Sequence, residues 1–430
     1  MKLLLFLGVM IFLFLIGFSV PYAIGFTSLI IFVVDRGGIT NIPMDIVAQR
    51  IMGGANSFTM LAVPFFLFAG KLMNTGGITQ KIFKFANEVV GRLPGGLGVA
   101  NVLTSVIFAG MSGSAVADCA GLGTIEIRAM EDAGFDTPFA AGVTAASSTV
   151  GPVIPPSVPL VMFGVMGNVS IASLLIAGMI PGILMGLAMS VLVVMISIKR
   201  GYPRNPDFSW KRLWHSFKEA ILPILTPVIL IGGIMTGVFT ATEAAVVASV
   251  YALILCAVVY RQLTLKAFIQ ICKDTIRESV LILFIVGASN LYGYLLTRSQ
   301  LPTILMNAVF EFTKNKTVIL ALVNVFLLIV GCFMECNAAI MILAPMLVPL
   351  CTAVGVSGVQ LGVIMVLNLM IGLLTPPVGM CLFTTARVAK IRIEKMIREA
   401  MPFYIPLGIV LILVTYVPQI SLWLPNLLLG

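Results

Sequence analysis

Two stretches decide the fold: Val150-Gly151-Pro152-Val153-Ile154-Pro155-Pro156-Ser157 and Gly372-Leu373-Leu374-Thr375-Pro376-Pro377-Val378-Gly379. Each lies within an apolar segment that is long enough to cross a bilayer. A helix cannot continue through adjacent prolines without losing backbone hydrogen bonds. At membrane depth, free backbone groups are tolerated only where protein or a water-filled cavity satisfies them. The two breaks therefore predict an ion or solute site inside a membrane protein.

The composition supports this class of protein. Of the 430 residues, 60% are hydrophobic and 10% are charged, and the mean hydropathy is +1.11. Soluble domains carry about 25% charged residues. The apolar segments are about 20 residues long and lack the alternation of a β-barrel, which predicts an all-α polytopic membrane protein.

The remaining composition excludes several functions. The net charge of +9 comes from basic residues in short loops, which is typical of topology determinants and not of nucleic-acid binding. Seven cysteines without a Cys-x-x-Cys motif and a single histidine, His215, argue against disulfides, zinc and haem. The sequence contains no P-loop and no catalytic set. We therefore expect neither an enzyme nor a cofactor.

The chain is predicted to consist of two repeats, 1–198 and 221–430, joined by a cytoplasmic basic loop and surface helix at 199–220. The first repeat is expected to contain short helices at 3–17 and 20–34, a polar connection at 35–55, a span at 57–75, a surface helix at 78–92, a re-entrant hairpin at 95–132, a broken helix at 137–168 and a span at 171–198. The second is expected to contain spans at 221–239, 242–260 and 276–297, a re-entrant hairpin at 317–353, a broken helix at 358–386 and a last span at 401–423.

A shift of 221 positions superposes the two repeats. It places Gly110 on Gly331, Gly151 on Gly372, Pro155-Pro156 on Pro376-Pro377 and Pro181 on Pro402. With the N-terminus outside, 20 of the 26 Lys and Arg residues fall on the inside, as the positive-inside rule requires. Each repeat then has five spans and one hairpin. Because the number of spans in each repeat is odd, the second repeat is inverted relative to the first, as in secondary transporters. Both termini then lie outside.

The hairpin tips and the breaks supply oxygen atoms, which sodium prefers, and helix C-termini that carry partial negative charge. Ser112 and Ser114 lie at the first tip, opposite the carbonyl groups of the break at Gly151. At the second tip, Met334, Glu335 and Asn337 lie opposite the break at Thr375. Small hydroxyl residues also let helices pack closely, which is the structural alternative for any one serine.

The helix N-termini at the same breaks favour a bound carboxylate. The candidate solute-binding residues are Ser114, Ser157, Arg298, Glu335, Asn337 and Thr375. Arg298 would contact an anionic solute through two hydrogen bonds, or it is an ordinary interfacial arginine. The intramembrane carboxylates Asp118 and Glu335 are candidate proton carriers. Glu243 is assigned to a capping box within Thr240-Ala241-Thr242-Glu243.

The motifs resemble the large membrane subunit of tripartite ATP-independent periplasmic (TRAP) transporters. The resemblance rests on Gly110-Met-Ser-Gly-Ser-Ala-Val-Ala-Asp118, Gly151-Pro-Val-Ile-Pro-Pro-Ser157, Gly237-Val-Phe-Thr-Ala-Thr-Glu-Ala-Ala245 and Leu374-Thr-Pro-Pro-Val-Gly379. It covers nearly the whole chain and implies an ion-transporter-superfamily fold that works as an elevator in the bacterial inner membrane.

The resemblance also implies sodium-driven uptake of a carboxylated solute, with sialic acid favoured and a C4-dicarboxylate next. Expected partners are membrane lipid, a periplasmic substrate-binding protein and a small four-helix membrane subunit, which should be a separate chain. By similarity, the residues of one sodium site are Gly110, Ser112, Ser114, Val150, Gly151 and Val153. Those of the other are Gly331, Met334, Asn337, Gly372 and Thr375.

Two other functions remain open from the sequence. A stand-alone sodium- or proton-coupled carboxylate transporter would work without a binding protein. An intramembrane enzyme or assembly scaffold would move no solute, and it would leave the inverted symmetry unexplained.

Overall fold

The computed structural model describes residues 2–75, 77–112, 114–204 and 209–429. These residues form helices and connecting turns, and none of them lies in a strand. By length and composition, eight of their helical segments could cross a membrane. A ninth forms if Thr137–Val153 and Val158–Gly167, which are bent by 42°, count as one span. The prediction of an all-α polytopic membrane protein is confirmed.

The first part of the chain, up to residue 200, forms eleven α-helices. They are α1 (Lys2–Leu15), α2 (Val20–Arg36), α3 (Met44–Ala55), α4 (Ala62–Thr75), α5 (Ile78–Val90), α6 (Gly96–Ser112), α7 (Ala115–Ala120), α8 (Leu122–Asp132), α9 (Thr137–Ser148), α10 (Val158–Gly167) and α11 (Ile171–Arg200). Short 3-10 turns lie at η1 (Ile39–Asn41), η2 (Phe58–Leu61) and η3 (Gly151–Val153).

The second part forms another eleven α-helices. They are α12 (Trp210–Met235), α13 (Ala241–Ile254), α14 (Leu265–Arg298), α15 (Leu301–Phe312), α16 (Lys316–Phe333), α17 (Cys336–Ala353), α18 (Gly358–Leu373), α19 (Met380–Val388), α20 (Ile393–Ala400), α21 (Tyr404–Tyr416) and α22 (Gln419–Leu429). A π-helical turn, η4 (Leu255–Val259), follows α13, and a 3-10 turn, η5 (Met401–Phe403), precedes α21.

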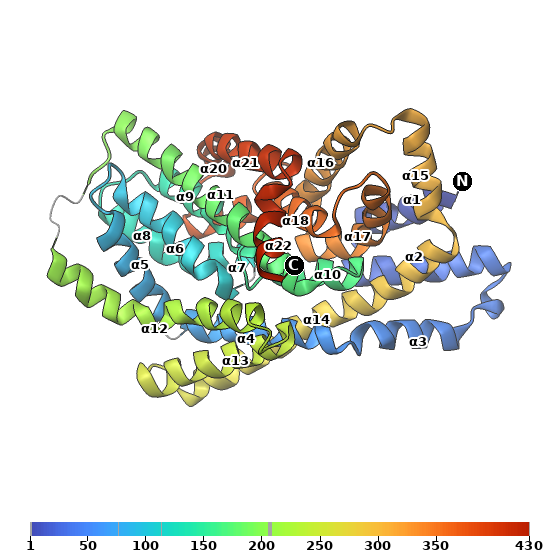
Figure 1. Cartoon of the computed structure of the whole chain (residues 1–430), viewed down its shortest axis with the longest axis horizontal. Coiled ribbons are helices and arrows are strands. Elements are labelled where there is room, and N and C mark those ends of the chain that lie inside the picture. Colours follow the sequence, from blue (N-terminus) through green and yellow to red (C-terminus); the bar gives the residue numbers. More distant parts are fainter. Residues whose placement is uncertain (1, 76, 113, 205–208, 430) are drawn as a thin grey trace.

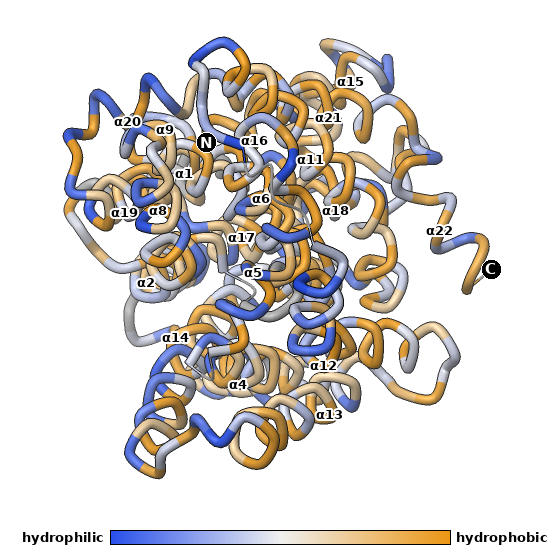
Figure 2. Tube along the Cα trace, turned by 90° about the vertical axis from the view of Figure 1, so that its left-hand side faces the viewer, coloured by the Kyte–Doolittle hydropathy of each residue, from blue (hydrophilic) through white to orange (hydrophobic). Residues whose placement is uncertain are grey.

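The helices form two bodies that lie against each other. Helices α4, α12, α13 and α14 lie along one side of the molecule in both views, and most of the remaining helices lie above them (Figures 1 and 2). Apolar residues dominate the trace in both bodies (Figure 2). Helix α14 has 34 residues, so it is about 50 Å long, and it packs against α2, α3, α4 and α17.

Helices α9 and α18 lie at the centre of the upper body, and each ends at one of the proline-containing breaks. All residues of α9 from Phe139 and all residues of α18 from Gln360 are buried. A helix that is buried on every side needs an apolar sequence all round. This explains why both stretches lack an amphipathic pattern.

Buried polar side chains connect each of these two helices to its neighbour. Ser147 of α9 donates a hydrogen bond to Asn101 Oδ1 of α6 (2.7 Å), and Asn101 donates one to Thr144 (2.7 Å). In α18, Asn368 donates to Asn324 Oδ1 of α16 (2.8 Å). Burying a polar group without a hydrogen bond costs free energy, so these hydrogen bonds favour one position of each broken helix on the helix beside it.

Several elements differ from the expectations. The segment 35–55, expected as a polar connection, contains the helix α3. This helix is amphipathic: its polar face is exposed, and residues such as Val47 are buried against α14. The boundary expected between a surface helix at 199–220 and a span at 221–239 was wrong, since α12 runs through both without a break. Helix α15 was not expected, and the last span is interrupted between α21 and α22 at Pro418.

Other expectations agree with the structure. The capping box at Thr240 is present, with the Glu243 carboxylate accepting from the Thr240 backbone N–H (2.8 Å). Shifting the bounds of α6, α9 and α10 by 221 positions brings each within four residues of the bounds of α16, α18 and α19. The inverted topology stays a prediction. Both arms of 317–353 are 18 residues long and meet the length criterion for a span, so the re-entrant hairpin also stays a prediction.

Helix α11 packs directly on the first break through two glycines. A Cβ atom on Gly178 would lie 2.2 Å from the Val153 carbonyl oxygen, and one on Gly182 would lie 2.1 Å from the Ile154 side chain. Only a residue without a side chain allows a helix to approach the backbone this closely. The glycines therefore hold the break against a rigid helix.

We predict that Gly178→Ala destabilises the protein by about 1–3 kcal/mol, because the new methyl group meets backbone that cannot move aside. Thermal unfolding in detergent measures the change. Gly232→Ala in α12 is the matched control, since a Cβ atom there meets nothing within 4 Å. Equal melting temperatures for the two variants would contradict this packing.

Candidate functional site

The second tip and the second break are in direct contact. A Cβ atom on Gly372 would lie 2.4 Å from the Gly331 carbonyl carbon, and one on Gly331 would lie 3.1 Å from the Gly372 Cα. The Gly379 N–H also donates to the Cys332 carbonyl oxygen (3.4 Å). The α16–α17 tip and the α18–α19 break are therefore in contact, and two of the predicted residues, Gly331 and Gly372, meet there.

Glu335 caps α17 and holds the side chain of Asn337. The Ala338 backbone N–H donates to Glu335 Oε2 (3.1 Å), and Asn337 Nδ2 donates to Glu335 Oε1 (2.9 Å). This orientation leaves Asn337 Oδ1 buried without a hydrogen-bond donor among the described residues. An unsatisfied buried acceptor costs free energy, so Asn337 Oδ1 is well suited to a cation as ligand.

Thr375 and Met334 lie at the ends of the same two helices. Thr375 donates its hydroxyl proton to the Ile371 carbonyl oxygen (2.8 Å), and its hydroxyl oxygen can still accept a donor or a cation. Met334 is the C-cap of α16, with its N–H bonded to the Val330 carbonyl (3.0 Å). The C-terminal ends of α16 and α18 thus direct partial negative charge toward the contact between tip and break.

The first break is more tightly closed. Val150, Gly151 and Val153 are fully buried, and the Val150 carbonyl accepts from the Val153 N–H (3.0 Å). Ser157 is also fully buried. Its hydroxyl donates to the Pro152 carbonyl and accepts from the Leu160 N–H. Ser157 therefore caps α10 and ties the break to it, and it lines neither of the two cavities described below.

Part of the first tip lies outside the described residues. Gly110 and Ser112 belong to the last turn of α6, and their side chains lie outside the described part of the structure. Ser114 is described and caps α7, where its hydroxyl accepts from the Ala117 N–H (3.4 Å). Asp118 is buried in α7.

Ser114 lines a cavity of about 340 Å³ between α7 on one side and α4 and α14 on the other. Opposite Ser114, Lys71 of α4 and Glu278 of α14 form an ion pair of 2.6 Å. Of the residues predicted to bind the solute, all of which the structure describes, Ser114 alone lines this cavity. The Lys71–Glu278 pair was not predicted from the sequence, because its two residues are 207 positions apart.

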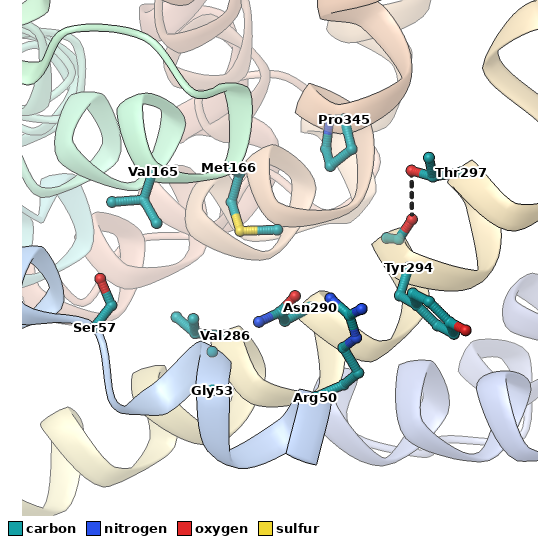
Figure 3. A pocket seen from close by; sticks show the side chains of 12 residues that line it. Arg50, Gly53, Ser57, Val165, Met166, Val286, Asn290, Tyr294, Thr297 and Pro345 are labelled. Carbon is teal, nitrogen blue, oxygen red and sulfur yellow. Dashed lines mark hydrogen bonds between the residues drawn. The ribbon is translucent and has the colours of Figure 1, made fainter. Parts of the chain in front are cut away.

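A larger cavity of about 590 Å³ lies farther along α14 (Figure 3). Its walls include Arg50 of α3, Asn290 and Thr297 of α14, Met166 of α10 and Pro345 of α17. Arg298, the arginine favoured from the sequence, is exposed at the end of α14 and is not part of this wall. The sequence placed Arg50 in a polar connection, so its position in a cavity was missed.

The described residues contain no cluster of three or more His, Cys, Asp or Glu side chains that could hold a metal ion. The polar groups at the tips and breaks are carbonyl, hydroxyl and amide oxygens and the Glu335 carboxylate, and hard cations prefer oxygen ligands. The chemistry of both breaks therefore fits an alkali cation, and the cavities fit small solutes, whose pockets are typically about 300–1,000 Å³.

Comparison with known proteins identifies the family. Residues 7–420 match the family described as "Tripartite ATP-independent periplasmic transporter, DctM component". The chain is 45% identical to the sialic acid TRAP transporter large permease SiaM of Vibrio cholerae over 89% of this chain and 90% of that one. It is 38% identical to the sialic acid TRAP permease SiaT of Haemophilus influenzae over 96% of this chain and 66% of that one.

Other relatives transport different solutes or share the fold alone. The C4-dicarboxylate TRAP large permease DctM of Pseudomonas aeruginosa is 36% identical over 88% of this chain and 89% of that one. The transporter YdaH of Alcanivorax borkumensis, whose topology is described as unusual, superposes with a TM-score of 0.64 at 15% identity and covers 88% of each chain. That superposition supports the fold and says nothing about the solute.

We predict that Gly372→Ala separates the second tip from its break, since the added methyl group would clash with the Gly331 backbone. The half-buried Cys332 thiol next to this contact should then react faster with a thiol reagent. Mass spectrometry distinguishes it from the other partly exposed thiol, Cys272. Gly408→Ala, where a Cβ atom meets nothing within 4 Å, should leave the Cys332 rate unchanged; equal rates in both variants would refute the contact.

Proposed function

Because this chain belongs to the DctM component family of tripartite ATP-independent periplasmic transporters, we propose that it is the membrane subunit of a sodium-coupled importer for a carboxylated solute. It is a multi-span helical protein, and its family implies the bacterial inner membrane. The observation that carries the proposal is the family match over residues 7–420. Sialic acid is the favoured solute and a C4-dicarboxylate is the next, in the order of identity among the relatives that are named for a carboxylate.

Sodium coupling is supported by the two tips and breaks. At the second, Asn337 Oδ1 is a buried acceptor that no described donor satisfies, and the C-terminal ends of α16 and α18 meet at Gly331 and Gly372. Helix C-terminal ends and backbone carbonyls of broken helices are the ligands that secondary transporters use for sodium. At the first, we assign the corresponding role to Ser112, Ser114 and the backbone at 150–153.

An elevator movement is supported by where the cavities lie. Both cavities have α14 on one side, and on the other side they have elements that carry the tips and breaks, namely α7 for one and α10 and α17 for the other. We propose that the tips and breaks move together against the layer of α4, α12, α13 and α14 (Figure 1). Movement of one body past the other would expose each cavity to a different side of the membrane.

The partners follow from the family. We propose that a small four-helix membrane subunit packs within the lipid on the layer of α4, α12, α13 and α14. A periplasmic binding protein would deliver the solute. Among the relatives, the permease DctMQ of Oleidesulfovibrio alaskensis is longer, and this chain covers 64% of it, as expected if both membrane subunits are fused there. Both termini of this chain would face the periplasm.

A proton-coupled, stand-alone transporter is the second candidate, and buried carboxyl groups favour it. Glu126 of α8 is 1% exposed, and its Oε1 has no hydrogen-bond partner among the described residues. Asp118 is buried one helix earlier. Buried carboxyl groups within membranes commonly carry protons.

Uptake into proteoliposomes distinguishes the two candidates. The vesicles would contain this chain and the small subunit, with the binding protein and labelled sialic acid or succinate outside. The importer requires an inward sodium gradient and the binding protein. Uptake that follows a pH gradient and proceeds without the binding protein would select the second candidate, and no uptake of either acid would contradict both.

We predict that Asn337→Ala raises the sodium concentration for half-maximal uptake by about tenfold, because one ligand of the cation is lost. Asn307→Ala is the matched control, since Asn307 is exposed on α15, away from the tips. Sodium dependence should be measured in both variants after confirming equal melting temperatures. An unchanged sodium dependence in Asn337→Ala would remove this residue from the site.

A further inference from the structure

The cavity between α3 and α14 on one side and α10 and α17 on the other contains a single cationic side chain in its wall. That side chain is Arg50, and no acidic residue lies in the wall with it. Among the described residues, Arg50 takes part in no ion pair. A cation in a concave site without a counter-ion attracts anions.

The guanidinium group of Arg50 is held in place by an aromatic ring. Its Cζ atom lies 4.3 Å from the centre of the Tyr294 ring of α14. Figure 3 shows the side chain rising from α3 toward Asn290, with Met166 and Pro345 across the open space. A guanidinium group that lies over an aromatic ring is held by the face of the ring and not through its N–H groups. The fork of N–H groups therefore remains available to bind a carboxylate.

The platform that presents Arg50 is rigid because α3 and α14 approach each other through glycines. A Cβ atom on Gly54 would lie 2.8 Å from the Asn290 Cβ, and one on Gly287 would lie 2.8 Å from the Ile51 carbonyl oxygen. Both glycines lie within one turn of a residue in the cavity wall. Close helix packing of this kind fixes Arg50 and Asn290 relative to each other.

The two cavities follow each other along α14. Glu278 lies in the wall of the cavity that contains Ser114, and Asn290 lies in the wall of the cavity that contains Arg50. Val286 is the residue of that wall nearest to Glu278 along α14, and eight positions correspond to about 12 Å along the helix axis. The Arg50 cavity is therefore separate from the Ser114 cavity, and it lies toward the end of α14 that the charge pattern places outside.

We propose that the Arg50 cavity is an outer binding site for the transported carboxylate, in which Arg50 takes the carboxylate and Asn290 donates to a neighbouring oxygen atom. The proposal rests on the proposed function for the identity of the solute. The volume of about 590 Å³ accommodates a single small acid. An arginine that only anchored the chain at the membrane surface would point into the headgroup layer and not toward Asn290 and Tyr294.

Thiol protection tests the site without measuring transport. Gly293 lines the cavity, and a Cβ atom there meets nothing within 4 Å, so Gly293→Cys places a thiol in open space. A membrane-impermeant thiol reagent should label it in proteoliposomes that contain both membrane subunits. Free N-acetylneuraminic acid (sialic acid) should slow the labelling, and its methyl ester, which lacks the negative charge, should not.

Adding Arg50→Gln should raise the concentration of acid that gives half-protection by about tenfold or more, because a two-point charge-assisted contact is lost. Arg50→Lys should restore part of the protection. Arg36→Gln, at an exposed position at the end of α2, is the matched arginine control and should change nothing. Glu311→Cys, exposed on α15, should be labelled at the same rate with or without the acid.

The outcomes separate this proposal from the transport function. Protection that depends on Arg50 supports the site even if uptake fails. Uptake by the unmodified protein together with no protection at Gly293→Cys, or with protection that survives Arg50→Gln, would overturn the site and leave the importer intact. Protection by the binding protein but not by the free acid would also overturn it, since the cavity would then be a docking surface for protein.

Discussion

The structure depends on one constraint: helices that stop inside an apolar body leave backbone oxygens and N–H groups that must find partners there. At the first break the protein supplies most of those partners itself, through the Ser157 hydroxyl and the turn at Val150. At the second, Gly331 and Gly372 bring two helix C-terminal ends together, and Asn337 Oδ1 is left without a donor. The two regions therefore differ in whether a buried polar atom still lacks a hydrogen-bonding partner. A cation would satisfy the second.

The same constraint explains why buried glycines and asparagines are so prominent. Gly178 lets α11 cover the first break, and Gly54 lets α3 lie close to α14. Asn101 and Asn368 each form a buried hydrogen bond beside a broken helix. These residues contribute little apolar area. They determine how closely neighbouring helices approach each other and how each broken helix sits on the helix beside it.

The sequence was sufficient to predict where the helices break. Adjacent prolines at 155–156 and 376–377 marked the breaks, and α9 and α18 end just before them. Helix α3 was missed because its polar face resembles a loop, and α12 was divided because a basic segment and an apolar segment share one helix. The Lys71–Glu278 pair and the position of Arg50 could not be predicted, since they depend on how distant helices pack. Arg298, at the outer end of a predicted span, was a candidate solute-binding residue, but the wall of the larger cavity contains Arg50.

Density maps of the membrane complex, prepared once in sodium and once in a large organic cation, would show whether a cation binds at the second tip and break. We expect a spherical density in sodium that contacts Asn337 Oδ1 and the carbonyl groups at the ends of α16 and α18, and we expect its loss in the organic cation. A map in which α18 and α19 form one continuous helix, or in which a protein donor occupies Asn337 Oδ1 under both conditions, would contradict it.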